Sequence, residues 1–216
     1  MSLDRLIAEA RGVIATALRE PSASCVTSSF QHDCVVLLHL VTAEMPDIPV
    51  LFLDTDYHFR ETIEYRDRMA CDWNLNLRVL KAPQPVTPRL YETDPDGCCH
   101  LRKVEPLFAG LAAYDTWFTA LRREQSPTRA NLEIHDKFKL PSGKTLQKIS
   151  PLAEWTNRDV WQYIERFAIP VLPLYQRGYT SIGCEPCTSL PVSADDLRSG
   201  RWQGKKLECG IHLQAK

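Results

Sequence analysis

The stretch PVLFLDT, Pro49 to Thr55, decides the fold. It is a short apolar run bounded by turn-forming residues, a pattern typical of a strand buried in the middle of a parallel sheet. Its polar last residues, Asp54 and Thr55, would lie at the carboxyl end of that strand. Because parallel sheets bind ligands at the carboxyl ends of their strands, this stretch predicts a fold class and also the edge at which a site should lie.

Helical and strand-like patterns alternate on both sides of this run. Apolar residues recur at helical spacing before it, a short β-prone segment leads into SSFQHD, and a buried helix follows that loop. The predicted order is a helix over 3–18, a strand over 25–28, a helix over 34–41, the strand at Pro49, a helix over 58–69 and a strand over 76–80. This alternation indicates an α/β fold with a doubly wound, mostly parallel sheet and helices on both faces.

The second half of the chain has weaker signals. Residues 82–97 are rich in Pro, Asp and Thr and read as a loop, and a helix should start near Cys98 and be interrupted by Pro106. A strand is expected over 114–119. Thr156 and Asp159 form a T-x-x-D cap that begins a helix, and the chain from residue 170 onward reads as loop and tail.

Charge and hydropathy exclude two classes of partner. The net charge is −1, so the chain lacks the global basic field of a nucleic-acid-binding protein. It contains no apolar window long enough for a membrane helix, and MSLDRLIAEAR reads as an amphipathic helix rather than an export signal, which predicts a cytoplasmic protein. Residues 98–216 hold 17 Lys/Arg against 12 Asp/Glu, which favours a small anionic ligand there or merely an uneven surface.

Eight cysteines suggest metal binding or catalysis, because the cytosol keeps thiols reduced. Cys184 and Cys187 have C-x-x-C spacing, and Cys98 and Cys99 are adjacent. Four thiolates can hold zinc or an iron–sulfur cluster. The adjacent pair favours a [4Fe–4S] cluster, although spacing alone leaves zinc, no metal or a purely structural staple open. The scattered cysteines, which are Cys25, Cys34 and Cys71, are expected to be inert core residues.

Cys209 stands apart from both cysteine groups, in LECGIHLQ near the end of the sequence. A thiolate on a flexible tail could close over a substrate and later reach a second thiol outside, and Gly210 would supply backbone freedom. Lys103 lies one helical turn beyond Cys99 and would bring a cation to the same region. Tail and clustered cysteines therefore suggest different tasks.

The chain resembles the adenosine 5′-phosphosulfate (APS) and 3′-phosphoadenosine 5′-phosphosulfate (PAPS) reductases over Ser28 to Leu213. SSFQHDCVVLLHL is similar to their modified phosphate-binding loop, and LDTDYHFRETIEY to the next strand-end signature. The remaining motifs follow in the family's order: CCHLRKVEPL, LRREQSPTR, PLAEWTNRDVWQYI, YTSIGCEPCT, GRW and ECGIHL. The resemblance implies a sheet of the adenine nucleotide alpha hydrolase-like (PP-loop) type. The cysteine set resembles the assimilatory iron–sulfur branch, which mainly uses APS.

The resemblance implies a thiol mechanism. Cys209 would attack the sulfur of APS, AMP would leave, and the S-sulfocysteine would be reduced by a thioredoxin or glutaredoxin, which frees sulfite for cysteine biosynthesis. A non-redox [4Fe–4S] cluster would be held by Cys98, Cys99, Cys184 and Cys187. We expect a nucleotide-binding and iron–sulfur domain over 1–195 and a flexible catalytic tail over 196–216. Whether the protein is a homo-oligomer is left open.

The family's motifs also imply substrate contacts. The phosphosulfate needs fixed cations, and arginine suits oxyanions best. The residues assigned to it are Lys103, Arg129, Arg198, Arg201 and His212, where His212 could also lower the pKa of Cys209. Ser28, Ser29 and Phe30 should wrap the adenosine and α-phosphate through backbone N–H groups and ring contact, and Asp54 and Thr55 should close the far side. Arg122 and Arg123 are weaker candidates, expected to form surface ion pairs.

Some positions depart from the family. Gln31 and His32 stand where a small residue is usual, Asp56 replaces a glycine, and Ala120 replaces another beside the adenosine. These changes affect discrimination against the 3′-phosphate, so PAPS reduction is one alternative. An ATP pyrophosphatase that thiolates or adenylates a substrate is another, but SSFQHDC lacks the glycines of the S-G-G-x-D-S loop that it would need. A zinc-stapled nucleotide-binding module without catalysis is a third.

Overall fold

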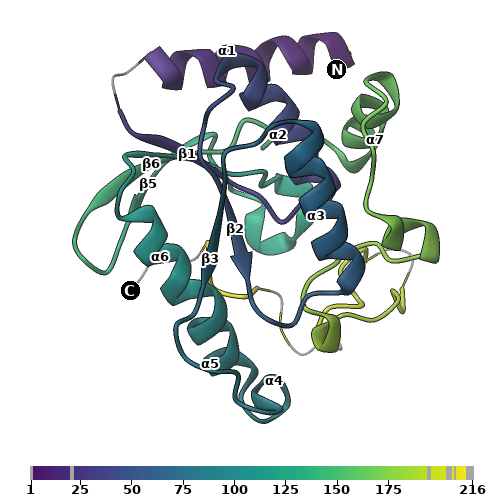
Figure 1. Cartoon of the computed structure of the whole chain (residues 1–216). Coiled ribbons are helices and arrows are strands. Elements are labelled where there is room, and N and C mark those ends of the chain that lie inside the picture. The colour runs from purple at the N-terminus through teal and green to yellow at the C-terminus, as the bar shows by residue number, and fades with distance from the viewer. Residues whose placement is uncertain (1, 20–21, 194–195, 203–205, 207, 213–216) are drawn as a thin grey trace.

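The computed structural model describes residues 2–19, 22–193, 196–202, 206 and 208–212. Within them a six-stranded sheet forms the centre of the molecule, in the order β3-β2-β1-β4-β6-β5 (Figure 1). The strands are β1 (Ser24–Thr27), β2 (Val50–Asp54), β3 (Leu77–Lys81), β4 (Thr116–Phe118), β5 (His135–Lys139) and β6 (Thr145–Ile149). All neighbours pair in parallel except β5, which pairs antiparallel with β6 at the edge.

The strand order reverses at β1. The chain moves from β1 outward to β2 and β3, then returns to the other side of β1 with β4, which pairs with β1 in the register Cys25 to Trp117. A ligand crevice is expected where strand order reverses, outside the carboxyl ends of the strands. The loops that follow β1, β2 and β4 therefore meet at one edge of the sheet.

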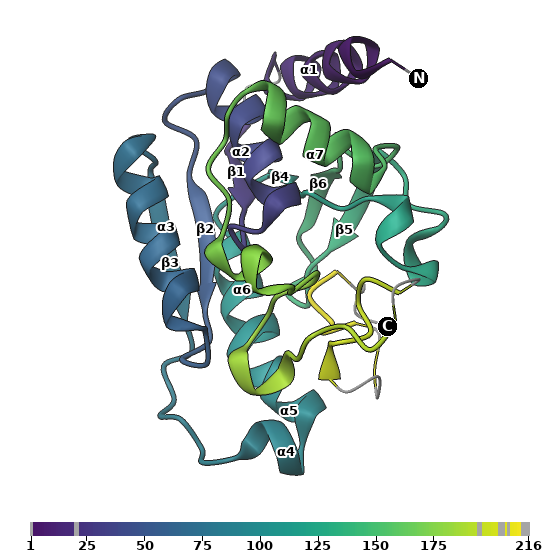
Figure 2. The ribbon, with the colours of Figure 1, turned by 90° about the vertical axis from the view of Figure 1, so that its right-hand side faces the viewer.

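Helices cover both faces, as the alternation predicted. One face carries α2 (His32–Glu44), α3 (Arg60–Asp72) and α7 (Asn157–Arg166), and the other carries α6 (Glu105–Leu111) (Figure 2). Successive side chains of a strand point to opposite faces of the sheet, so each face has its own hydrophobic core. Val26 and Phe52 belong to the core under α2, α3 and α7, and Leu51 and Trp117 to the core under α6.

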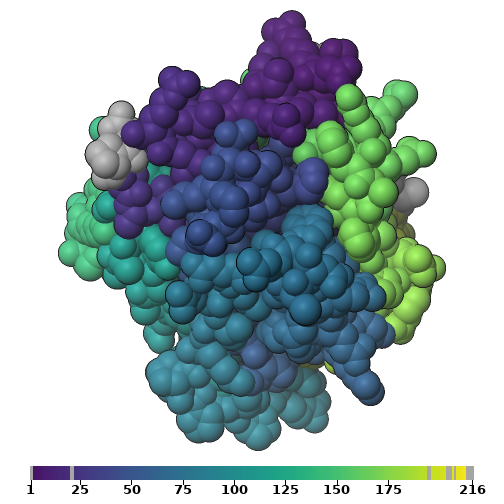
Figure 3. All heavy atoms as spheres, turned by 45° about the horizontal axis from the view of Figure 1, so that its top comes forward, coloured from purple at the N-terminus to yellow at the C-terminus, as the bar shows by residue number. Residues whose placement is uncertain are grey.

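The first helix forms an outer layer. α1 (Leu3–Arg19) packs on α2 and α7, and Figure 3 shows the first and last of these helices, in purple and green, meeting on one face of the molecule. None of the helices in the described ranges is both long and apolar enough to cross a bilayer.

The structure differs from the sequence prediction around the adjacent cysteines. The segment expected as a loop contains α4 (Leu90–Thr93) and α5 (Pro95–Cys99), so the cysteine pair ends a helix instead of beginning one. Asp94 sets this start because its side chain accepts a hydrogen bond from Gly97 N at 2.9 Å. A π-helical turn, His100–Val104, then leads into α6, and such turns recur at functional sites.

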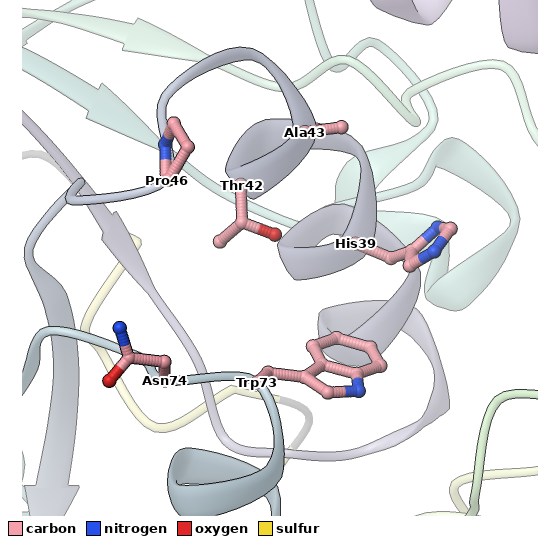
Figure 4. Close-up of a pocket in the computed structure, with 6 residues that line it drawn as sticks. All are labelled: His39, Thr42, Ala43, Pro46, Trp73 and Asn74. Carbon is pink, nitrogen blue, oxygen red and sulfur yellow. The ribbon is translucent and has the colours of Figure 1, made fainter.

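A hollow of about 480 Å³ lies between the carboxyl end of α2 and the turn after α3 (Figure 4). It is at the opposite end of α2 from the SSFQHD loop. Its one titratable side chain, His39, is hydrogen-bonded through Nδ1 to the Tyr163 hydroxyl at 2.8 Å. Size alone therefore does not locate the active site.

Candidate active site

The loop after β1 turns sharply at Phe30. This residue has a φ of +56°, in the left-handed region, and its backbone N–H donates to Ser28 Oγ at 3.0 Å. The Phe30 ring is fully buried and packs edge-on against Phe52. The ring therefore supports the loop from the core, which leaves only the Phe30 backbone for the nucleotide contact predicted from the sequence.

The two large residues that replace small ones anchor this loop. Gln31 Oε1 accepts from Ile182 N at 2.9 Å, and its Nε2 donates to Ser29 Oγ at 3.1 Å. The His32 ring bridges the Tyr175 hydroxyl, 2.6 Å from Nδ1, and Asn157 Oδ1, 3.1 Å from Nε2. These departures from the family pattern tie the loop to the segment that leads into the C-x-x-C turn.

The loop after β2 keeps the backbone shape that a glycine would provide. Asp56 has a φ of +64°, a conformation that aspartate tolerates better than most residues. Its N–H donates to Asp54 Oδ1 at 3.0 Å, and its carboxylate forms ion pairs with Lys81 and, at 3.2 Å, with the buried Arg102. The loop is thereby joined to the π-helical turn that follows the cysteine pair.

The four clustered cysteines converge from two distant segments. Cys98, Cys99 and Cys184 are buried and Cys187 is half-buried. Burial raises the pKa of Cys98 to about 11, and the charges of Cys99, Cys184 and Cys187 add to the effect. The C-x-x-C turn docks on the loop after β2, where Glu185 N donates to Tyr57 O at 2.6 Å.

Among the described residues no three His, Cys, Asp or Glu side chains form a group that could hold a single metal ion. The four thiols nevertheless interact electrostatically with one another. Four thiols are a donor set that either zinc or an iron–sulfur cluster could use.

Two cations are shared by the clustered cysteines and Cys209. Burial alone would lower the pKa of Lys103, but the negative charges of Cys184, Cys209 and Cys99 outweigh it and raise the pKa. Burial lowers the pKa of Arg201. Electrostatic interactions with Cys184, Cys209, Cys187 and Cys99 would raise it, but they do not outweigh the effect of burial.

Arg201 lies directly against Gly183, where an added Cβ would come within 2.1 Å of Nη2. A larger residue before Cys184 would therefore have to displace the Arg201 guanidinium. Lys206 adds a third cation, with Nζ 3.4 Å from Cys99 Sγ and 2.7 Å from Asp96 Oδ1.

The tail is held on the opposite side by Glu208. Its carboxylate accepts two hydrogen bonds from Arg129, at 2.9 and 2.8 Å, and a third from Thr128 Oγ1 at 3.0 Å. Burial would raise the pKa of Glu208, but Arg129 and then Arg198 lower it below the ordinary value. Glu208 is therefore ionised, and both partners of the pair are largely excluded from solvent.

His212 is half-buried and lies beside the same cations. Its ring stacks on Trp117 with centroids 5.5 Å apart, and its carbonyl accepts from Lys148 Nζ at 3.5 Å. Burial lowers the pKa of His212 well below its ordinary value, and Arg129, Lys148 and Arg198 lower it further. The imidazole is neutral, so it cannot supply the positive charge that would depress the pKa of Cys209.

The residues assigned to the phosphosulfate gather around the tail, from segments far apart in the sequence: the cations Lys103, Arg129, Arg198 and Arg201, and the neutral His212. Thr55, expected at the nucleotide, is buried and its hydroxyl lies 3.2 Å from Cys184 Sγ. Ala120, at the end of β4, is buried near the same edge. Sequence reasoning missed Glu208 and Lys148, although the placement of Glu208 next to Cys209 was visible.

Two minor predictions were wrong. Arg122 is not a surface residue: it is buried and its Nε donates to Asp33 Oδ1 at 2.6 Å. Arg123 does form an exposed ion pair, with Glu154. Cys25 is a core residue as expected, but Cys71 is exposed.

Comparisons with known proteins agree with this geometry. The phosphoadenosine phosphosulfate reductase domain family matches residues 23–190. The adenosine 5′-phosphosulfate reductase of Streptomyces coelicolor is 43% identical over 196 residues, which are 87% of this chain and 81% of the relative. The enzyme of the same name from Mesorhizobium japonicum is 43% identical over 194 residues, 86% of this chain and 74% of the relative.

Solved structures support the fold. The PAPS reductase of Candida auris, in a phosphate complex, superposes with a TM-score of 0.73 at 24% identity, over 87% of this chain and 96% of that one. The FMN adenylyltransferase of Candida glabrata gives 0.68 at 17% identity, over 99% and 76%. The PP-loop type of sheet is thereby confirmed, and from the family match and the curated relatives, the chain belongs to the phosphoadenosine phosphosulfate reductase family.

Proposed function

We propose that this protein reduces APS to sulfite and AMP in assimilatory sulfate reduction, with electrons from a thioredoxin or glutaredoxin. The observation that carries the proposal is the position of the tail: an added Cβ on Gly210 would lie 3.4 Å from Val104, and Cys209 interacts electrostatically with Lys103 and Arg201. A nucleophilic thiol beside fixed cations is suited to an anionic sulfur electrophile. The names of the curated relatives support APS as the substrate.

The cationic wall fits a phosphosulfate. Arg129 and Arg198 lie on the Glu208 side, and Lys103 and Arg201 on the Cys209 side. Arg201 Nε and His212 Nδ1 are buried and have no hydrogen-bond partner among the described residues. Buried donors without partners are costly, and oxyanion oxygens of a bound substrate would satisfy both, His212 as its Nδ1–H tautomer.

The reaction follows from two thiol attacks. Cys209 Sγ attacks the sulfate sulfur, a sulfur–sulfur bond forms, the bond from sulfur to the bridging oxygen breaks, and AMP leaves with that electron pair. A thiolate of the reductant then attacks Cys209 Sγ, and sulfite leaves with the electrons of the sulfur–sulfur bond. The reductant's second thiolate resolves the mixed disulfide, so the dithiol ends as a disulfide and Cys209 is regenerated. The second attack requires Cys209 to leave the site, as proposed for the catalytic tail over 196–216, of which residues 203–205, 207 and 213–216 lie outside the described residues.

The cofactor proposed for Cys98, Cys99, Cys184 and Cys187 is a [4Fe–4S] cluster. When bound, it would supply charge and hold the two cysteine segments together without passing electrons to the substrate. Lys103 would lie between it and the reacting sulfur, and Lys206 would face Cys99. These cations offset the negative charge of thiolate ligands and keep the region favourable to an anionic substrate.

The proposal is tested by intact mass spectrometry after the protein is mixed with APS and no reductant. The chain should gain the mass of one SO₃ group, lose it on addition of reduced thioredoxin, and gain nothing in Cys209→Ser. A mass gain that persists in Cys209→Ser would refute the assignment of the nucleophile. Parallel incubation with PAPS measures substrate preference, and APS is expected to react faster.

A further inference from the structure

Glu208 and Cys209 are adjacent residues with different cationic neighbours. Glu208 makes a two-pronged ion pair with Arg129, and Cys209 interacts electrostatically with Lys103 and Arg201. The Arg129 and Glu208 side chains are only 13% and 12% exposed, and Thr128 and Gln125 complete their hydrogen bonds. The tail itself therefore supplies the negative charge that Arg129 requires.

A guanidinium has one flat, two-pronged edge for a carboxylate, sulfate or phosphate. Glu208 already uses Nε and Nη2 of Arg129, and Nη1 is hydrogen-bonded to Gln125. An oxyanion of the substrate cannot bind that edge while Glu208 remains. Because Arg198 also lowers the pKa of Glu208, the carboxylate lies close to a second proposed substrate cation.

We propose that Glu208 is a substrate-displaced latch: its carboxylate occupies the oxyanion position at Arg129, holds the tail closed over the empty site, and is expelled when an oxyanion binds. The inference rests on the proposed function and assigns Glu208 a role in it. Displacement frees the segment that carries Cys209, so the same event that admits the substrate gives the nucleophile freedom to move. Glu208 is a positioning residue, because it acts through Arg129 and the tail.

The latch has a measurable cost in affinity. When a ligand binds only the open form, its apparent Kd equals the Kd for that form divided by the fraction of the protein that is open. If the latch is closed about nine-tenths of the time, its removal should tighten oxyanion binding about tenfold. A residue that only helped to fold the tail would have the opposite effect, because its loss would weaken binding.

The first test measures the alkylation rate of Cys209 by peptide mass spectrometry, in the full-length protein without nucleotide. Glu208→Gln keeps the shape and removes the charge, and Glu208→Asp keeps the charge on a shorter arm. Glu154→Gln is the matched control, since Glu154 pairs with Arg123 on the surface. The latch predicts faster alkylation in Glu208→Gln, a smaller increase in Glu208→Asp and none in Glu154→Gln.

The second test adds inorganic sulfate, with chloride at equal ionic strength as the control. Sulfate should accelerate alkylation of the wild type and leave Glu208→Gln unchanged. A third measures APS binding by calorimetry in the Cys209→Ser background, where Glu208→Gln should lower Kd severalfold. Weaker APS binding together with unchanged alkylation would overturn the latch. If sulfate releases the tail but APS does not bind, the latch stands and the proposed substrate is wrong.

Discussion

The hydroxyl oxygen of Thr55 lies 3.2 Å from the sulfur of Cys184, and this contact joins the end of β2 to the C-x-x-C turn. Thr55 is 1% exposed and its Oγ1 also accepts from Tyr57 N at 3.4 Å. Thr55, which was expected to face the nucleotide, therefore contacts the C-x-x-C turn. Sheet edge and cysteines form one unit, in which a change at either is transmitted to the other.

Thr55→Val should lower the free energy of unfolding by about 1 kcal/mol, since it replaces the hydroxyl by a methyl group of the same size. It should also lower the iron content per chain of freshly purified protein, because Cys184 loses the hydroxyl that lies 3.2 Å from its sulfur. Thr55→Ser keeps the oxygen and serves as the control. Equal iron content in the valine and serine variants would contradict a supporting role.

Arg122 and Arg123 provide a matched pair of predictions. Arg122→Met leaves Asp33 buried without its cation and should cost about 3–5 kcal/mol, whereas Arg123→Met removes an exposed pair and should cost at most about 1 kcal/mol. Urea unfolding of both variants measures the difference. If both variants lost the same free energy of unfolding, the burial of Arg122 would not contribute to stability.

The buried ion pair of Asp33 and Arg122 predicts that the protein loses stability in acid. Burial would raise the pKa of Asp33, but the charges of His32 and Arg122 and the hydrogen bonds from Arg122 and Gln125 lower it below 3.8. A depressed carboxyl pKa gives stability that is present above the ordinary value and is lost as the pH falls through the lower one. In Asp33→Asn this part of the acid unfolding profile should be absent.

Sequence patterns predicted most of the fold because most of its elements are amphipathic or buried in an ordinary way. The helices α1, α2, α3 and α7 and the strands β1 to β4 agree with their predicted positions within a few residues. The β5–β6 hairpin was not predicted: in the edge strand HDKFK the only apolar residue is Phe138, and in TLQKI the apolar residues are Leu146 and Ile149. The start of α5 depended on Asp94 as a cap inside a segment that resembled a loop.

The site was predictable only where family motifs carry it. The motif residues Lys103, Arg129 and Arg201 are near the tail, as the resemblance implied. Burial was not visible in the sequence, and it changed the interpretation of Arg122, Phe30 and His212. Contacts such as that of Glu208 with Arg129 join residues 79 positions apart, which no local pattern encodes.

Asp56 tests the backbone and the ion pair separately. Both Asp56→Gly and Asp56→Ala remove the partner of buried Arg102 and should cost about 2–3 kcal/mol. Alanine should cost about 1 kcal/mol more, because only glycine adopts a φ of +64° without strain. Denaturant unfolding separates the two, and equal stability would show that the left-handed conformation carries no strain.

His212 should make docking of the tail sensitive to mild acid. The groups that face it are Arg129, Lys148 and Arg198, and burial is the largest cause of its lowered pKa. A docked His212 stays neutral, while an undocked one takes up a proton as the pH falls through about 6.5. Protonation therefore stabilises the undocked tail, so docking is strongest above that pH and weakens below it. Glu208 remains ionised in this range because its own pKa is lowered.

The measurement is the ratio of Cys209 alkylation rates in the wild type and in His212→Asn, taken at each pH so that the titration of the thiol itself cancels. Asparagine keeps a polar side chain but cannot take up a proton. The ratio should be constant above about pH 6.5 and rise severalfold below it, as the wild-type tail undocks and the variant does not respond. A ratio that stays flat into the acid range would mean that His212 is not the group that couples protonation to release of the tail.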